Sequence, residues 1–176
     1  MGILRHFFSC KDVELRVKYW VYATGPLNIL LWGSTSWNLS DQNHIKLCAY
    51  HHSAIHWILG IWMEEVIECQ IMNKQVRNWF GNILPIAKLL MRRTWRYIGG
   101  VYREKEETMP KQMLGAWVPA LQKSGRPQMS CKDNFINSLR SVLKDQISKD
   151  AMFKEWFPIA INETLWNSLI DTHFQT

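Results

Sequence analysis

Apolar residues recur at three- and four-residue steps along most of this chain, and that spacing restricts its fold more than any other feature. The spacing is clearest in a predicted helix from Ile86 to Arg103. Its apolar side comprises Ile86, Leu89, Leu90, Ile98 and Val101. Its basic side comprises, for the most part, Lys88, Arg92, Arg93 and Arg96. No stretch of useful length alternates apolar and polar residues as a half-buried strand would, so we predict an all-α fold.

Helix caps and breakers divide the rest of the chain into further predicted helices. Thr24-Gly25-Pro26 separates a helix over residues 12–23 from a second one that runs to Trp32. Ser40 is a good N-cap for a long helix that ends near Gly60. Shorter helices are expected over residues 64–72 and from a cap at Asn73 to Gly81. From residue 133 onward the pattern is again helical.

The expected architecture is an irregular helical bundle with a loop-rich basic segment and a C-terminal helical tail. The bundle would span residues 1–104, the basic connector 105–132 and the tail 133–176. A chain of 176 residues is long enough for one domain with a real core, or for a small domain with a docked tail.

The positive charge is concentrated in the middle of the chain. The formal net charge is +6, but residues 74–132 carry twelve Lys and Arg against three Glu, and the rest of the chain is slightly acidic. Such a segment favours a polyanionic partner, and we expect nucleic acid. The longest apolar run, Tyr19 to Gly33, is too short and too broken to span a bilayer, so no membrane partner is expected. Four scattered cysteines and no clear secretion signal favour an intracellular protein, nuclear or cytoplasmic, with reduced thiols.

No complete catalytic constellation is apparent, so we expect no independent enzyme and no cofactor. The sequence has no Gly-rich phosphate cradle, no nucleophile elbow and no acidic cluster for two magnesium ions. Glu64, Glu65 and Glu68 are interpreted as a solvated helix face. His44, Cys48, His52 and His56 share one predicted helix, but His44 and His56 would lie roughly 18 Å apart along it, so one metal ion cannot bind all four. A small metalloenzyme on His52 and His56 with a distant third ligand is an alternative, although no metal is expected.

Candidate phosphate contacts lie in the basic segment. They are Lys88, Arg92, Arg93, Arg96, Arg103, Lys111, Lys123 and Arg126. Arginine binds phosphate oxygens, and the interleaved rings of Trp95, Tyr97 and Tyr102 could stack on bases or ribose. The alternative is that the charges only solubilise a helix whose aromatic side chains face inward.

Five short motifs resemble, in order and spacing, the region downstream of the polymerase domain in LINE-type (non-LTR) retrotransposon reverse transcriptases. The family's "YGSETW"-like segment is similar to Leu31-Trp32-Gly33-Ser34-Thr35-Ser36-Trp37, and its "RILGI" to Trp57-Ile58-Leu59-Gly60-Ile61. Its arginine-rich "RRxRWLGHVxR" is similar to Arg92-Arg93-Thr94-Trp95-Arg96-Tyr97-Ile98-Gly99-Gly100-Val101-Tyr102-Arg103. Its "LPKQ" and "GRP" elements are similar to Met109-Pro110-Lys111-Gln112 and Gly125-Arg126-Pro127. The resemblance covers roughly Leu15 to Lys132.

The resemblance implies a thumb and post-thumb helical piece of an RNA-directed DNA polymerase. Such a piece grips the template–primer (an RNA–DNA hybrid or duplex) while the chemistry occurs in the upstream polymerase domain of the same polyprotein. The chain departs from the family pattern in three places: Gly99-Gly100 replaces a Gly-His pair, Thr35 replaces an acidic residue, and the polymerase's paired aspartates are missing. These departures imply a fragment or a degenerate copy that is not an enzyme on its own.

A protein-interaction module is the main alternative to a nucleic-acid-binding segment. The chain has ten Trp, which suit a small core, an aromatic binding face, or both. In this interpretation the helical tail docks on a polymerase or another chain through its tryptophans, and the basic face is merely solvated.

Overall fold

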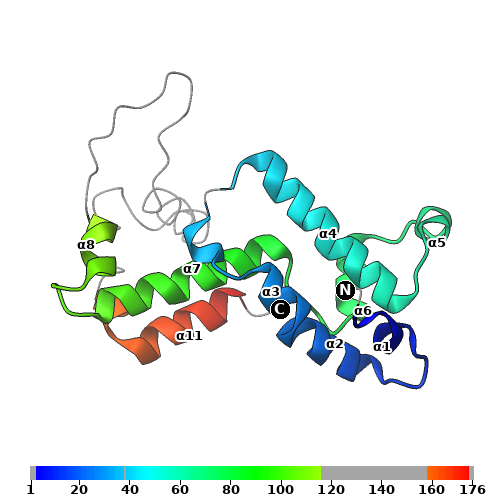
Figure 1. Ribbon diagram of the computed structural model, residues 1–176, viewed down its shortest axis with the longest axis horizontal. Helices are drawn as coiled ribbons and strands as arrows, with labels where there is room; N and C mark the ends of the chain where they lie inside the picture. The colour runs from blue at the N-terminus through cyan, green and yellow to red at the C-terminus, as the bar shows by residue number, and fades with distance from the viewer. Residues whose placement is uncertain (1–2, 38, 116–157, 175–176) are drawn as a thin grey trace. The chain divides into compact units, whose positions relative to one another are not determined.

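The computed structural model describes residues 3–37, 39–115 and 158–174, with the side chains of 113–115 excepted (Figure 1). Every regular element in these residues is a helix, which confirms the predicted all-α class. The structure divides into two compact units. The described part of unit 1 comprises residues 3–33 and 39–89, and that of unit 2 comprises residues 34–37, 90–115 and 158–174.

The helices of unit 1 begin and end close to the predicted caps. They are α1 (Arg5–Ser9), α2 (Leu15–Thr24), α3 (Pro26–Leu30), α4 (Asp41–Leu59), α5 (Met63–Glu68) and α6 (Asn73–Trp79). Ser40 caps α4 as expected, because its side chain accepts a hydrogen bond from the Asn43 backbone N–H at 3.4 Å. Gly60 ends α4 in the left-handed conformation with φ +72°, where glycine meets no steric penalty.

Several boundaries in unit 1 differ from the expected ones: α2 begins at Leu15 instead of residue 12, α3 ends at Leu30 instead of Trp32, and no sequence pattern predicts α1. Helix α5 stops at Glu68 because Gln70 adopts a positive φ of 50°, so the chain turns before Met72. Asn73 is not the cap of α6 but its first residue. The side chain of Gln75 accepts a hydrogen bond from the Met72 backbone N–H at 2.8 Å, which places the cap one residue earlier than expected.

The core of unit 1 is built on aromatic rings from helices distant in sequence. The ring of Phe80 lies edge-on to Tyr19 and Tyr22, with centroids 5.7 Å away in both cases, and joins α2 to the end of α6. The Tyr22 hydroxyl also forms a hydrogen bond with Nδ1 of His51 at 2.9 Å, which ties α2 to α4. Further apolar side chains of unit 1 are buried, among them Leu27, Leu31, Ile55, Ile58, Val76 and Ile86.

Unit 2 is centred on α7 (Ile86–Arg103), which has the predicted bounds, and on α11 (Glu163–Phe174) (Figure 1). The indoles of Trp95 and Trp166 stack with centroids 5.7 Å apart and planes 22° apart, and both rings are fully buried. Trp166 Nε1 donates a hydrogen bond to the Trp95 carbonyl at 2.9 Å. Helix α8 (Met109–Gly115) belongs to the same unit.

The division between the two units lies inside α7, after Leu89. The sequence favours instead a boundary after residue 104 and a separate tail from residue 133. The described part of that tail, residues 158–174, packs with the second half of α7 in unit 2, because Trp166, Ile170 and Phe174 bury their side chains there. Residues 116–157, which hold the end of the predicted connector and the start of the predicted tail, lie outside the described residues.

Candidate functional site

Helix α7 carries five basic side chains and no acidic one between Ile86 and Arg103. The basic residues follow the helical repeat because an α-helix returns to the same face every three to four residues. Lys88 is exposed, and Arg93 is half-buried. Lys123 and Arg126, the two loop candidates, lie outside the described residues.

Asp171 of α11 contacts two of the predicted phosphate-binding arginines. Its Oδ1 lies 3.0 Å from Nη2 of Arg92, which donates a hydrogen bond to it, and 3.7 Å from Nη2 of Arg96. The side chain of Arg96 remains 53% exposed and that of Arg92 33% exposed. One carboxylate therefore offsets part of the charge of two guanidinium groups, and both remain within reach of solvent.

Arg103 and Lys111 have their contacts within unit 2. Arg103 Nη1 donates a hydrogen bond to the Ala160 carbonyl at 3.1 Å, and its Nη2 lies 3.8 Å from a Glu163 carboxylate oxygen. Lys111 lies 2.8 Å from a Glu106 carboxylate oxygen and donates to the Glu104 carbonyl at 2.9 Å. These two side chains hold the ends of α7 and α8 in place, so their availability for phosphate is lower than that of Arg96.

The three aromatic residues proposed as stacking partners have different surroundings. Trp95 is fully buried against Trp166 and Phe174, so it cannot stack on a base, and the expectation for this residue is wrong. Tyr97 is 45% exposed, beside Arg96. Tyr102 is half-buried, and burial raises the pKa of its hydroxyl. Only Tyr97 offers a ring to solvent on the exposed side of α7.

The histidines of α4 have separate roles instead of a common ligand set. Nε2 of His52 accepts a hydrogen bond from Arg77 Nη1 at 3.0 Å, which places a positive guanidinium at one of the two ring nitrogens that could bind a metal ion. Burial, followed by Arg77 and His56, lowers the pKa of His52. Nδ1 of His44 lies 3.8 Å from the Cys48 sulfur, one turn away. No group of three or more potential metal ligands occurs among the described residues.

His51 is the buried histidine of this helix. Its ring is inaccessible to solvent and stacks on Tyr22, with centroids 5.9 Å apart. Burial, with a smaller contribution from the neighbouring His52, lowers the pKa of His51 to about 4. The residue is therefore a neutral core side chain near pH 7.

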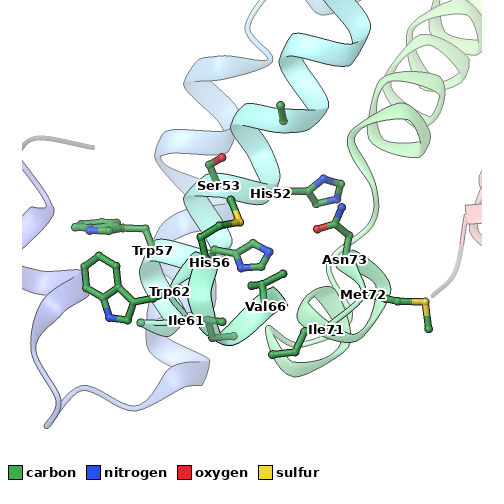
Figure 2. Close-up of a pocket in the computed structure, with 13 residues that line it drawn as sticks. His52, Ser53, His56, Trp57, Ile61, Trp62, Val66, Ile71, Met72 and Asn73 are labelled. Atoms are coloured by element: carbon green, nitrogen blue, oxygen red, sulfur yellow. The ribbon is translucent and has the colours of Figure 1, made fainter. Parts of the chain in front are cut away.

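A groove of about 720 Å³ opens beside the C-terminal half of α4, and sequence reasoning did not anticipate it. In Figure 2, the side chain of His56 lies between those of Ser53 and Val66, with Trp57 and Trp62 on one side and His52 and Asn73 on the other. No Lys, Arg, Asp or Glu lines it. The residues that the sequence offers as a metal pair, His52 and His56, are thus, with Ser53 and Asn73, the polar positions of a groove lined mainly by apolar side chains.

Large apolar side chains are exposed around this groove and elsewhere on unit 1. Trp62, Met63 and Met72 line the groove and are 65–72% exposed. Away from it, Trp20 is 65% exposed and Trp32 84%. Among the described tryptophans, Trp95 and Trp166 form a buried pair in unit 2, whereas Trp20, Trp32, Trp62 and Trp79 are exposed on unit 1.

Within the described ranges, no helix combines the length and the apolar character needed to cross a membrane. No protein-family model, no curated protein and no solved structure matches this chain.

Proposed function

We propose that this chain is a non-catalytic nucleic-acid-binding segment that grips a template–primer duplex through the basic side of α7. The observation that carries the proposal is the charge of this helix: five basic side chains and no acidic one, with Arg96 and Lys88 exposed. Asp171 and Glu163 offset part of that charge without reversing it. A row of positive side chains favours phosphate contacts and hence binding that depends little on sequence.

The geometry of α7 supports contacts to several phosphates of one strand. Lys88, Arg92 and Arg96 recur at four-residue steps of a continuous helix, over a length of roughly 12 Å at 1.5 Å per residue, or about three to four base pairs at the 3.4 Å spacing along one strand. Asp171 holds the Arg92 and Arg96 side chains in one region of the surface. It also competes with phosphate for them, so the affinity contributed by this pair is smaller than two uncompensated arginines would provide.

The resemblance to LINE-type reverse transcriptases supports the choice of an RNA–DNA hybrid or duplex as the partner. In that proposal the chemistry belongs to an upstream polymerase domain of the same polyprotein, and the chain described here is not an enzyme on its own. Its location would be intracellular, nuclear or cytoplasmic. The arginine-rich motif has a second, structural use in this chain, since Trp95 and Gly99 within it pack against α11.

A salt titration with a fluorescent RNA–DNA hybrid tests the proposal. The dissociation constant should rise steeply with salt, with a slope of about 0.9 per phosphate neutralised. Replacing Arg92, Arg93 and Arg96 together with Gln should weaken binding about tenfold or more at low salt and flatten that slope. The matched control removes the same charge from exposed positions of unit 1 by replacing Arg5, Lys11 and Lys46 with Gln. Equal losses in both triple variants, or no binding at low salt, would contradict a specific role of α7.

A protein-interaction module is the second candidate, favoured by the exposed tryptophans of unit 1. Indoles as exposed as Trp32 (84%) and Trp62 (69%) are unusual in a protein that functions without a partner. Binding of an apolar dye, or association that persists at high salt, would support this function. If dye binding and association both disappear at high salt, only the nucleic-acid-binding function would remain as a candidate.

A further inference from the structure

The groove beside α4 has the size and shape of a helix-binding site. Ala49, Ser53, His56 and Gly60 line it from one face of α4 and its end, at the three- and four-residue steps of that face. Met63 and Val66 of α5 line it as well. From Ala49 to Gly60 the groove follows roughly 16 Å of helix, which is about the length of three turns of a bound helix.

The lining of the groove favours a bound helix that presents a row of apolar side chains. Two indoles, two methionine side chains and the side chains of Ile61, Val66 and Ile71 dominate it, and its polar residues are His52, Ser53, His56 and Asn73, with no Lys, Arg, Asp or Glu among them. Methionine adapts to irregular partners because its side chain is unbranched and polarizable. The exposed fractions of Trp62 and Met63, 69% and 72%, indicate an open surface that suits a macromolecule better than an enclosed small ligand.

Charge at the rim distinguishes one end of the groove. Glu64, Glu65 and Glu68 of α5 are exposed, and none of them forms an ion pair with the described residues. From Cys48 to Asn73 the sequence has no Lys or Arg at all. Lys74 and Arg77 follow on α6, and Arg77 is bonded to His52. The α5 end is therefore acidic within a chain of net charge +6.

We infer that this groove binds a basic amphipathic helix of a partner protein, whose apolar row enters the groove while its Lys or Arg side chains lie over α5. The inference rests on the second candidate function and names the chemistry of the partner. An apolar row supplies the contact area, as in other helix-in-groove complexes, and opposite charge at the rim sets the orientation. The α7 helix of a second copy is a poor occupant, because its apolar residues Ile86, Trp95 and Ile98 are already buried.

The test uses the full chain and two labelled helical peptides of about fourteen residues that share one leucine row. One peptide carries Lys at the exposed positions and the other carries Glu. Fluorescence anisotropy at low salt should show the Lys peptide binding at least about tenfold more tightly than the Glu peptide. Replacing Glu64, Glu65 and Glu68 with Gln should reduce that preference to about twofold or less. The replacement of Glu65 keeps a side-chain oxygen that can accept the hydrogen bond from the Trp62 backbone N–H.

Two variants separate the groove from general electrostatics. Ser53→Trp fills the groove from an exposed position and should abolish binding of the Lys peptide without unfolding the chain. The matched charge control replaces Glu104, Glu106 and Glu107 of unit 2 with Gln and should leave the preference unchanged.

Any of the following peptide results would overturn the inference: equal binding of both peptides, unchanged binding by Ser53→Trp, or an equal effect of the control triple variant. Self-association that Ser53→Trp abolishes would assign the groove to a second copy and also overturn it. In each case, dye binding that persists at high salt would still support the interaction-module function. If the parent protein shows no dye binding at high salt, the interaction-module function would be excluded as well.

Discussion

The indole of Trp166 occupies the space in which a side chain at Gly99 would begin. A Cβ built at Gly99 would overlap Nε1 and Cδ1 of that ring, whereas a Cβ at the next residue, Gly100, would have no neighbour within 4 Å. Helix α11 can approach α7 this closely only because residue 99 has no side chain. The close approach also lets Trp166 donate its hydrogen bond to the Trp95 carbonyl.

Gly99→Ala should therefore separate α11 from α7. We expect a loss of unfolding free energy of about 2 kcal/mol or more, since an overpacked site must shift a fully buried indole. Urea denaturation followed by tryptophan fluorescence measures the loss. Gly100→Ala is the matched control and should be neutral or stabilise by up to about 1 kcal/mol, because alanine is the better helix former. Equal stability of the two variants would refute the packing argument.

Asp171→Asn should increase affinity for nucleic acid. The substitution removes the carboxylate that lies 3.0 Å from Arg92 and 3.7 Å from Arg96, so both guanidinium groups become more available to phosphate. The expected gain is about two- to fivefold at low salt, and the loss of stability should stay below about 1 kcal/mol because the pair is partly exposed. Asp12→Asn removes the same charge from an exposed site and is the control. Weaker binding by Asp171→Asn would mean that the carboxylate orients the arginines productively.

His51 should make the protein less stable as the pH falls. The ordinary histidine pKa is 6.5, and burial lowers that of His51 to about 4, so between these values the unfolded state binds more protons than the folded one. The contribution of His51 to the free energy of unfolding is complete above pH 6.5, declines as the pH falls from about 6.5 to 4, and changes no further below that. The total loss is about 3 kcal/mol.

The measurement for His51 is the free energy of unfolding at a series of pH values. In His51→Gln, whose amide can still bond to Tyr22, the slope between pH 6.5 and 4 should be smaller than in the parent. His6→Gln changes an exposed histidine and should keep the parent slope. An unchanged slope in His51→Gln would show that other groups carry the pH dependence.

Tyr22→Phe should destabilise unit 1 by about 1–2 kcal/mol, because it leaves Nδ1 of the buried His51 without its 2.9 Å hydrogen bond. The packing of the ring against Phe80 is kept, so the hydrogen bond alone is removed. Chemical denaturation measures the difference. Tyr50→Phe, at an exposed ring on the same helix as His51, should change stability by less than about 0.5 kcal/mol. Comparable losses in both variants would exclude a special role of the buried pair.

The sequence by itself determined the helical class, the bounds of α7 and both caps of α4. Each of these depends on neighbouring residues: the apolar repeat of Ile86 to Arg103, the Ser40 side chain that accepts from Asn43, and the left-handed Gly60. Such signals are local in the chain, so they are legible without any knowledge of packing.

Only the tertiary structure decided what surrounds the candidate site. Arg92 meets Asp171 across 79 residues of sequence, and Trp95 turns inward because Trp166 lies 71 residues later on the helix that covers it. The groove beside α4 likewise forms only when α5 and α6 fold back along it. No local pattern encodes these contacts, because they depend on which helix faces meet when apolar surface is buried.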